Sequence, residues 1–181
     1  MEGGDDQGYR YAPGYNVMKP LFCSNLARSF FNLETVQEAR MTESLERFVQ
    51  AQASTYDRAL LELRRGSKEG HWMWFIFPQL RGLGVSENAT YYGLRGMEET
   101  REYLHHPLLG PRLERATHVV LDSEVALEQL LGALDAMKFA SCMTLFAAAA
   151  GEHSVYAQAL DGGVRVDSRT LELLKEPEEK N

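Results

Sequence analysis

Cysteine is scarce in this sequence. Its 181 residues include only Cys23 and Cys142, which lie far apart and form no CxxC pair. Numerous or closely spaced cysteines are typical of secreted disulfide-rich domains and of thiolate metal sites, so this pattern indicates neither. We therefore expect reduced thiols, no disulfide between the two cysteines, and a cytoplasmic protein.

Long hydrophobic runs and an excess of positive charge are also missing. No apolar run approaches the roughly 20 residues that a transmembrane helix requires. The 19 basic residues are outnumbered by 26 acidic residues, which gives a formal charge of −7. Nucleic-acid backbones and anionic membranes favour a basic face, so we expect no nucleic acid and no membrane as a partner.

Histidines with the spacing of metal ligands are absent as well. The five histidines form no HxxxH or HExxH pattern, which are the spacings that place two imidazoles on one side of a helix. We expect no tightly bound metal, and no motif indicates a cofactor.

The remaining composition is that of a soluble globular protein with one domain. Apolar residues make up 44% of the chain and the mean hydropathy is −0.34, both ordinary values for such a protein. Helical periodicity predicts a domain over residues 41–175, followed by a charged tail over residues 176–181.

Residues 1–40 form an extension ahead of this domain. Residues 1–16 are rich in Gly, Asp, Tyr and Pro without a period, which predicts disorder. Residues 18–33 are apolar and lack acids, which fits an arm that packs on the domain. They also fit a targeting segment if Met18 starts the chain, and the whole extension is extra translated sequence if Met41 does.

Apolar residues spaced three and four apart predict helices throughout the domain. The first helix begins at Thr42, a suitable N-cap, and ends in the run RRGSKEG at residues 64–70. Seven further helices are predicted at residues 86–95, 97–105, 111–121, 123–131, 134–149, 152–160 and 168–174. The expected fold is all-α, a single compact multi-helical domain with a mostly disordered N-terminal extension.

The stretch HWMWFIFPQL, residues 71–80, is the most apolar part of the chain and contains both tryptophans. Six consecutive apolar side chains hold too much hydrophobic surface to leave in water, so most of them are expected in the core. On a helix they point all the way round, so one or two should reach another surface. We expect Phe75→Ala and Phe77→Ala each to cost about 3–5 kcal/mol.

Polar side chains lie next to these apolar segments and make the candidate ligand-binding site. Buried polar groups need partners, and a lysine is rarely sealed in a core, so we expect these groups to face a cleft that holds water or a ligand. The candidate residues are His71, Trp72, Trp74, Gln79, Gln52, Tyr56, Lys138, Ser141 and Thr144.

Two weaker patterns receive structural interpretations. Lys138, Ser141 and Cys142 share a helix face, but no GxSxG accompanies them, so we assign no catalytic residue. The glycines of RGLGVS, residues 81–86, precede a predicted helix N-terminus, where free backbone N–H groups can bind an anion. Glu87 would repel a phosphate there, so we interpret this segment as a tight loop and a capped helix.

Several of these segments together resemble one known family. They are RFVQAQ (47–52), KEGHWMWFIFPQLRGLG (68–84), YLHHPLLGPRL (103–113) and KFASCMTLFAAAA (138–150). They resemble the small, mainly bacterial proteins of the domain-of-unknown-function family 1810, sometimes mislabelled as calpastatin, over residues 43–174. The resemblance implies a small all-α fold and no particular activity.

Three functions remain open from the sequence. The first is a non-catalytic domain that binds a small molecule or peptide in a cleft beside the HWMWFIFPQL stretch. The second is an enzyme that acts on a nucleotide or an ADP-ribose-like ligand, because YLHHPLLGPRL is faintly similar to a segment of the NADAR superfamily. The third is a protein-interaction module whose aromatic run is only core. The oligomeric state is not indicated.

Overall fold

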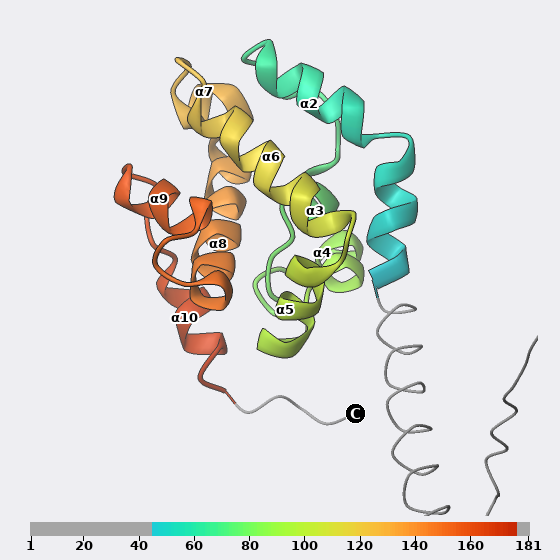
Figure 1. Cartoon of the computed structure of the whole chain (residues 1–181), viewed down its shortest axis with the longest axis vertical. Helices are drawn as coiled ribbons and strands as arrows, with labels where there is room; N and C mark the ends of the chain where they lie inside the picture. The colour runs from blue at the N-terminus through green and yellow to red at the C-terminus, as the bar shows by residue number, and fades with distance from the viewer. Residues whose placement is uncertain (1–44, 177–181) are drawn as a thin grey trace, which may run out of the picture. The chain divides into compact units, whose positions relative to one another are not determined.

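Helices form the regular structure of residues 45–176, the part of the chain that the computed structural model describes (Figure 1). The described chain begins in a helix at residues 45–53. It continues through α2 (Tyr56–Arg64), α3 (Met73–Ile76), α4 (Glu87–Tyr92), α5 (Met97–His105), α6 (Leu109–Leu121), α7 (Leu127–Leu131), α8 (Ala133–Ala150), α9 (Val155–Asp161) and α10 (Ser168–Leu173). Within these residues there is no strand, only an isolated parallel bridge between Leu80 and Leu94. The all-α class is confirmed.

The expectations for residues 1–40, for the helix start at Thr42 and for residues 177–181 of the tail lie outside the described residues. Cys23 lies outside them too, whereas Cys142 is a free, buried thiol.

Capping residues mark several helix ends where the sequence predicts them. The Ser86 hydroxyl accepts a hydrogen bond from the Ala89 N–H at the start of α4, and the Asp167 carboxylate accepts one from the Thr170 N–H at the start of α10. α5 ends at His105, two residues before Pro107. The capping side chains bond to backbone N–H groups a few residues away, and the proline disfavours helix in the residue before it. Short-range sequence is therefore enough to predict these helix ends.

The prediction of one continuous first helix is wrong. A turn at residues 54–55 separates residues 45–53 from α2, because the Thr55 N–H bonds to the Gln52 carbonyl and leaves the helical ladder. Two other helices start later than expected, α7 at Leu127 and α9 at Val155. Ser54 and Thr55 by themselves weaken a helix only slightly. Tertiary packing therefore decides the break at residues 54–55.

Helix α8 is the centre of the core. It packs against α3, α5, α7, α9 and α10, and buries Phe139, Met143, Leu145 and Phe146 completely. Among the described helices, α8 has the length and composition of one that could cross a membrane. The core helix of a globular domain has the same properties, and these packing partners account for the buried apolar residues of α8.

The HWMWFIFPQL stretch lies against α8 and α6 through α3. Trp72, Met73, Ile76 and Phe77 are buried, and the Phe77 ring meets Phe139 edge-on with the ring centroids 4.9 Å apart. Trp74 and Phe75 are only partly buried. The stretch is therefore mostly core, and it also reaches a surface.

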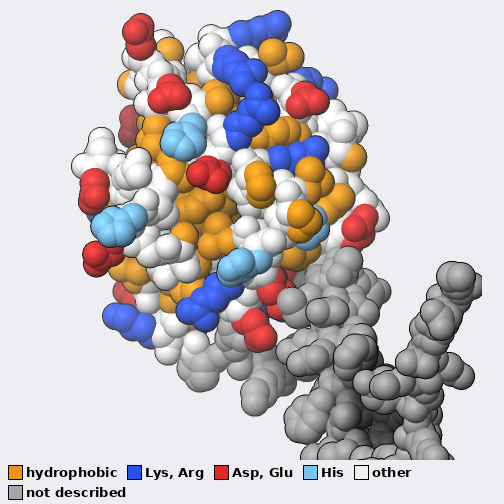
Figure 2. Space-filling view, viewed as in Figure 1, with side chains coloured by type: hydrophobic (Ala, Val, Ile, Leu, Met, Phe, Trp, Pro, Cys, Tyr) orange, Lys and Arg blue, Asp and Glu red, His pale blue; other side chains and the backbone are white. Residues whose placement is uncertain are grey.

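The outer surface carries both signs of charge. Figure 2 shows acidic and basic side chains spread over one face, with hydrophobic side chains reaching the surface between them. The large apolar side chains that stay exposed include Val85, Leu134 and Met137.

The different burial of two neighbouring phenylalanines gives a stability test. Phe77→Ala should lower the free energy of unfolding by about 3–5 kcal/mol, because it empties a fully enclosed site. Phe75→Ala should cost less, about 2 kcal/mol, because its ring already meets solvent. Urea unfolding of both variants checks this, and equal losses would contradict the assigned burial.

Candidate functional site

The segment of residues 65–72 links α2 to α3 and carries the candidate site. Gly66 takes a positive φ of 78° directly after α2, a conformation that glycine adopts without strain. The Lys68 N–H then donates to the Leu130 carbonyl of α7, 2.9 Å away. The segment is therefore tied to a distant helix as soon as it leaves α2.

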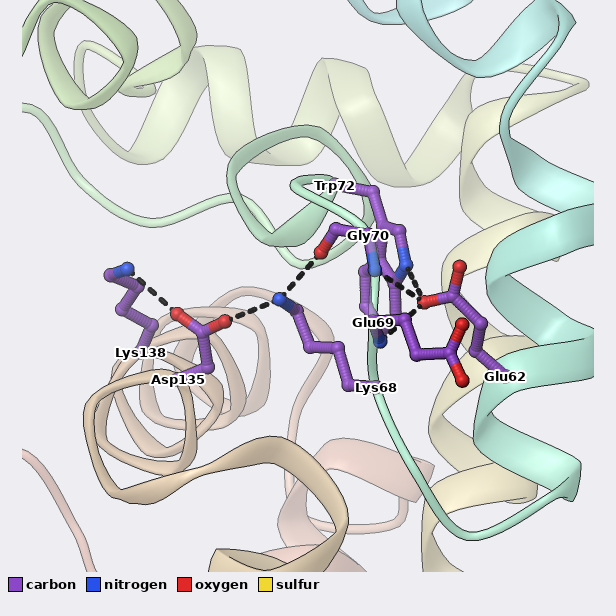
Figure 3. Close-up of polar contacts among 7 residues, drawn as sticks. All are labelled: Glu62, Lys68, Glu69, Gly70, Trp72, Asp135 and Lys138. Atoms are coloured by element: carbon purple, nitrogen blue, oxygen red, sulfur yellow. Dashed lines mark hydrogen bonds and ion pairs between the residues drawn. The ribbon is translucent and has the colours of Figure 1, made fainter.

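Glu62 holds the same segment from the other side. Its Oε2 accepts hydrogen bonds from the Glu69 N–H (2.8 Å), the Gly70 N–H (2.8 Å) and the Trp72 Nε1–H (2.7 Å) (Figure 3). Burial acts to raise the pKa of Glu62, but the hydrogen bonds from Gly70, Glu69 and Trp72 outweigh it and lower the pKa below its ordinary value. The carboxylate is thus held ionised in a buried position.

Lys68, Asp135 and Lys138 form a chain of ion pairs, which we name the Lys–Asp–Lys cluster. The Lys68 Nζ lies 2.6 Å from Asp135 Oδ2, and the Lys138 Nζ lies 2.7 Å from Asp135 Oδ1. Lys68 also donates to the Gly70 carbonyl at 2.7 Å, so it lies between α8 and the segment that Glu62 holds (Figure 3). Burial acts to raise the pKa of Asp135, but the two lysines outweigh it and lower that pKa.

Exposure increases along this cluster. The exposed side-chain fraction is 10% for Lys68, 17% for Asp135 and 30% for Lys138. Lys138 is therefore the member that a ligand in solution would meet first.

Both tryptophans lie next to the cluster. The Lys68 Nζ is 5.0 Å from the Trp72 ring centroid, and the Lys138 Nζ is 4.4 Å from that of Trp74. Trp72 is completely buried and Trp74 partly. Cation–π attraction at these distances holds each ammonium group against an indole face.

An apolar surface continues from the cluster along α8. Leu134 and Met137 are 75% and 68% exposed. Leu134 precedes Met137 by three residues and Lys138 by four, so it neighbours both of them on the α8 surface.

Gln52 and Tyr56, also candidates, belong to a different group. Gln52 Nε2 donates to the Phe75 carbonyl (2.7 Å) and to the Tyr103 hydroxyl (3.0 Å). The Tyr56 hydroxyl donates to the Arg112 carbonyl, and Arg112 Nη1 donates to Gln52 Oε1. These groups satisfy one another between helices.

Ser141 and Thr144 bond to backbone groups, and the Ser141 hydroxyl also lies within hydrogen-bonding reach of the Asp167 carboxylate. Ser141 Oγ donates to the Met137 carbonyl, whereas Thr144 Oγ1 donates to the Ala140 carbonyl and accepts from the Asp167 N–H. The neighbouring Cys142 is fully buried, and burial raises its pKa well above the ordinary value. None of these three groups is arranged as an activated nucleophile.

His71 and Gln79, the two polar residues on either side of the aromatic run, do not point to a shared group. Gln79 Nε2 donates to the nearby Phe77 carbonyl, and His71 is exposed. Of the nine candidates, the structure brings Trp72, Trp74 and Lys138 together at the cluster, with Ser141 one helical turn beyond Lys138 on α8. The contacts of Gln52, Tyr56, Gln79 and Thr144 place these residues in other groups.

Three central residues, Glu62, Lys68 and Asp135, were missed by sequence reasoning. The i, i+3 spacing of Asp135 and Lys138 was a usable signal. Lys68 lies in the run RRGSKEG, whose basic residues and glycines indicate only the end of a helix.

Two surface concavities lie away from the cluster. One of about 480 Å³ lies between the C-terminal ends of α2 and α6 and is lined by Arg64, Arg65 and Val125 among others. The second, of about 590 Å³, is lined by arginines near α4. Among the described residues, no group of three or more His, Cys, Asp or Glu side chains is placed to hold a metal ion.

Comparison with known proteins gives a family and a related fold. Residues 42–174 match the model of a family described as "Protein of unknown function (DUF1810)". No curated protein matches the chain. A solved structure that is similar is the crystal structure of the conserved hypothetical protein Rv1873 from Mycobacterium tuberculosis. It is 46% identical, with a TM-score of 0.70, and the match covers 74% of this chain and 97% of that one.

The lowered pKa values of Glu62 and Asp135 predict how stability depends on pH. A carboxyl group whose pKa is lower in the folded state stabilises the fold above its unfolded pKa. That contribution is lost as the pH falls through the folded value. Unfolding free energy should therefore fall below about pH 4.5, the ordinary value for glutamate. Glu62→Gln should cost about 2 kcal/mol at pH 7, because it weakens hydrogen bonds to a charged acceptor.

Urea unfolding between pH 7 and pH 3 measures this effect. The difference between wild type and Glu62→Gln, or Asp135→Asn, should shrink as the pH falls. Glu172→Gln, which changes an exposed carboxylate on α10, is the matched control and should show no such trend. A difference that stays constant down to pH 3 would contradict the assigned roles.

Proposed function

The chain belongs to the DUF1810 family, and for this member we propose the binding of a small molecule or peptide at the Lys–Asp–Lys cluster. The ligand carries a carboxylate or phosphate group next to an apolar group. No covalent chemistry is part of this proposal.

The observation that carries the proposal is the sharing of one carboxylate by two ammonium groups. Asp135 accepts from Lys68 with one oxygen and from Lys138 with the other, so the cluster holds two positive charges against one negative charge. A lysine ammonium has three N–H donors, and Asp135 takes one of those of Lys138. This partly exposed cation is therefore suited to a charge-assisted hydrogen bond from an anionic ligand.

The surroundings of Lys138 favour an amphipathic ligand. Trp74 provides an aromatic ring beside the ammonium group, and Leu134 and Met137 provide exposed apolar surface on the same helix. Ligand sites commonly combine apolar surface with a few polar groups that set orientation. An acid attached to an aliphatic or aromatic group matches this arrangement.

The alternative hypothesis, an enzyme that acts on a nucleotide or an ADP-ribose-like ligand, has less support from the geometry. The segment YLHHPLLGPRL has a clear structural role, because His106 Nδ1 accepts from the Leu108 and Leu109 N–H groups at the turn into α6. A side chain at Gly110 would place its Cβ 2.1 Å from the Leu104 carbonyl oxygen. Helix packing therefore explains the residues that carried the similarity.

A thermal-shift screen of carboxylates, phosphates and acidic peptides tests the proposal. A ligand at 100 times its dissociation constant stabilises the fold by about 2.7 kcal/mol, so a binder raises the melting temperature. We expect anionic amphiphiles to do so, and Lys138→Gln to weaken their binding by about tenfold, the size of one charge-assisted hydrogen bond. Lys138→Arg should retain most of the affinity.

Lys175→Gln, which removes an exposed lysine after α10, is the matched control and should bind as wild type does. Both tryptophans lie in the site, so their fluorescence reports binding directly, and Trp74→Phe should remove most of the change. Ligands that stabilise wild type and Lys138→Gln equally would place binding elsewhere and overturn the proposal. So would a screen in which no anionic amphiphile stabilises the protein.

A further inference from the structure

Three arginines from separate segments line one concavity near α4. Arg47 comes from the helix at residues 45–53, Arg81 from the loop after the aromatic stretch, and Arg95 from the link between α4 and α5. The concavity measures about 590 Å³, within the range of small-molecule sites. The chain as a whole has a net charge of −7. The three guanidinium groups make the lining of this concavity locally rich in positive charge.

The isolated bridge between Leu80 and Leu94 brings two of these arginines together. The Arg81 N–H donates to the Leu94 carbonyl at 2.8 Å, and the Leu94 N–H donates to the Gln79 carbonyl at 2.9 Å. Side chains alternate along extended backbone. Because Leu80 and Leu94 are buried, the residues that follow them, Arg81 and Arg95, both face outward.

Gly93 allows the two segments to approach this closely. A Cβ at that position would lie 2.8 Å from the Arg81 Cα and 2.6 Å from the Ala89 carbonyl oxygen. Any side chain there would push the end of α4 away from Arg81 and open the site.

The buried carboxylate of Glu99 orients the other side of the concavity. Its Oε1 lies 2.9 Å from Arg47 Nη2, and its Oε2 accepts from the Arg95 N–H at 2.7 Å. The Arg47 guanidinium also lies over the Phe48 ring, 4.4 Å from its centroid. Arg47 is thus held in one orientation, which lowers the entropy lost when a ligand binds.

An exposed aromatic ring completes the lining. Tyr91 is 57% exposed and meets Tyr92 edge-on at 4.9 Å. Tyr92 in turn packs on Phe48 and Phe75, which supports Tyr91 from behind. The concavity therefore offers a planar surface beside cationic forks, whose geometry matches phosphate and carboxylate groups.

We infer that this concavity is a second binding site, for a small molecule that carries a phosphate or carboxylate group beside a planar ring. It is separate from the Lys–Asp–Lys cluster and does not depend on the function proposed there. The guanidinium groups provide the recognition of the anion. The N-terminus of α4 is not counted as an anion site, because the helix has only six residues. Glu87 also lines the concavity, and its carboxylate opposes an anion and limits affinity.

Calorimetric titration at low salt with phenyl phosphate, benzoate and inorganic phosphate tests the site. The first two compounds distinguish a phosphate from a carboxylate ligand, and the third measures what the ring contributes. Phenyl phosphate or benzoate should bind more tightly than inorganic phosphate. Arg81→Gln and Arg95→Gln should each weaken binding by about tenfold, since each removes a charge-assisted contact.

Two further variants give results that a purely structural role for these residues would not. Glu87→Gln should strengthen binding, because it removes the opposing charge. Tyr91→Ala should abolish the preference for the compounds with a ring. Arg47 is left unchanged, since its guanidinium lies 2.9 Å from the buried Glu99. Arg95 Nε is a more distant partner of Glu99, at 4.0 Å, so thermal melting confirms that Arg95→Gln and the other variants fold.

Arg169→Gln on α10 removes the same charge from an exposed residue that does not line the concavity, and Lys138→Gln removes one from the Lys–Asp–Lys cluster. Arg169→Gln should not change the affinity. Because both ring compounds also belong to the ligand class proposed for the Lys–Asp–Lys cluster, the variants are compared in the Lys138→Gln background, where the binding that remains belongs to the arginine concavity. The inference is overturned if Arg169→Gln weakens binding as much as Arg81→Gln, or if Glu87→Gln fails to strengthen it. It is also overturned if neither ring compound binds the Lys138→Gln protein at concentrations up to about 10 mM.

Discussion

The carboxylate of Glu62 is the interaction on which the arrangement around α3 depends. It is buried, and one of its oxygens accepts from two backbone N–H groups and one indole N–H. The segment of residues 65–72 has no helix or strand of its own to satisfy these donors. A buried donor such as the Trp72 indole costs about 1–3 kcal/mol when unpaired. This acceptor, together with the bond from the Lys68 N–H to the Leu130 carbonyl, therefore sets the path of the segment.

The position of Lys68 follows from that path. With Glu69 and Gly70 held by Glu62, the preceding lysine reaches Asp135 on α8 and the Gly70 carbonyl together. Asp135 then holds Lys138 beside Trp74. Ion pairs of this kind contribute little net stability after desolvation, and their main effect here is to fix one register between the segment and α8. Glu62, an acidic residue within α2, thereby helps to position Lys68 and, through Asp135, Lys138 on α8.

Local signals in the sequence predict much of the fold. Ser86 and Asp167 cap the helices that they were expected to cap, and α5 ends just before Pro107. The break at residues 54–55 could not be predicted in the same way, because the three-and-four spacing of apolar residues continues through it. The break allows Gln52 and Tyr56 to join separate parts of a buried network with Tyr103 and Arg112, contacts between residues 50 or more positions apart.

The candidate site was predictable to a smaller extent. An indole beside a lysine was expected from the mismatch between polar side chains and apolar segments, and Lys138 does lie against Trp74. Glu62 and Lys68 gave no such signal, since a charged residue on an amphipathic helix or at its end is usually solvated. Their roles depend on how the segment of residues 65–72 folds back, and this is a tertiary property with no local motif.

Hydrogen exchange of the Glu69 and Gly70 amides tests the role of Glu62 most directly. Both belong to a surface segment outside any helix, where amides normally exchange within seconds to minutes. If Glu62 holds the segment, both should be protected with an opening free energy within about 2 kcal/mol of that of the α8 core amides. Exchange of both amides at unprotected rates, while the α8 amides stay protected, would contradict the account.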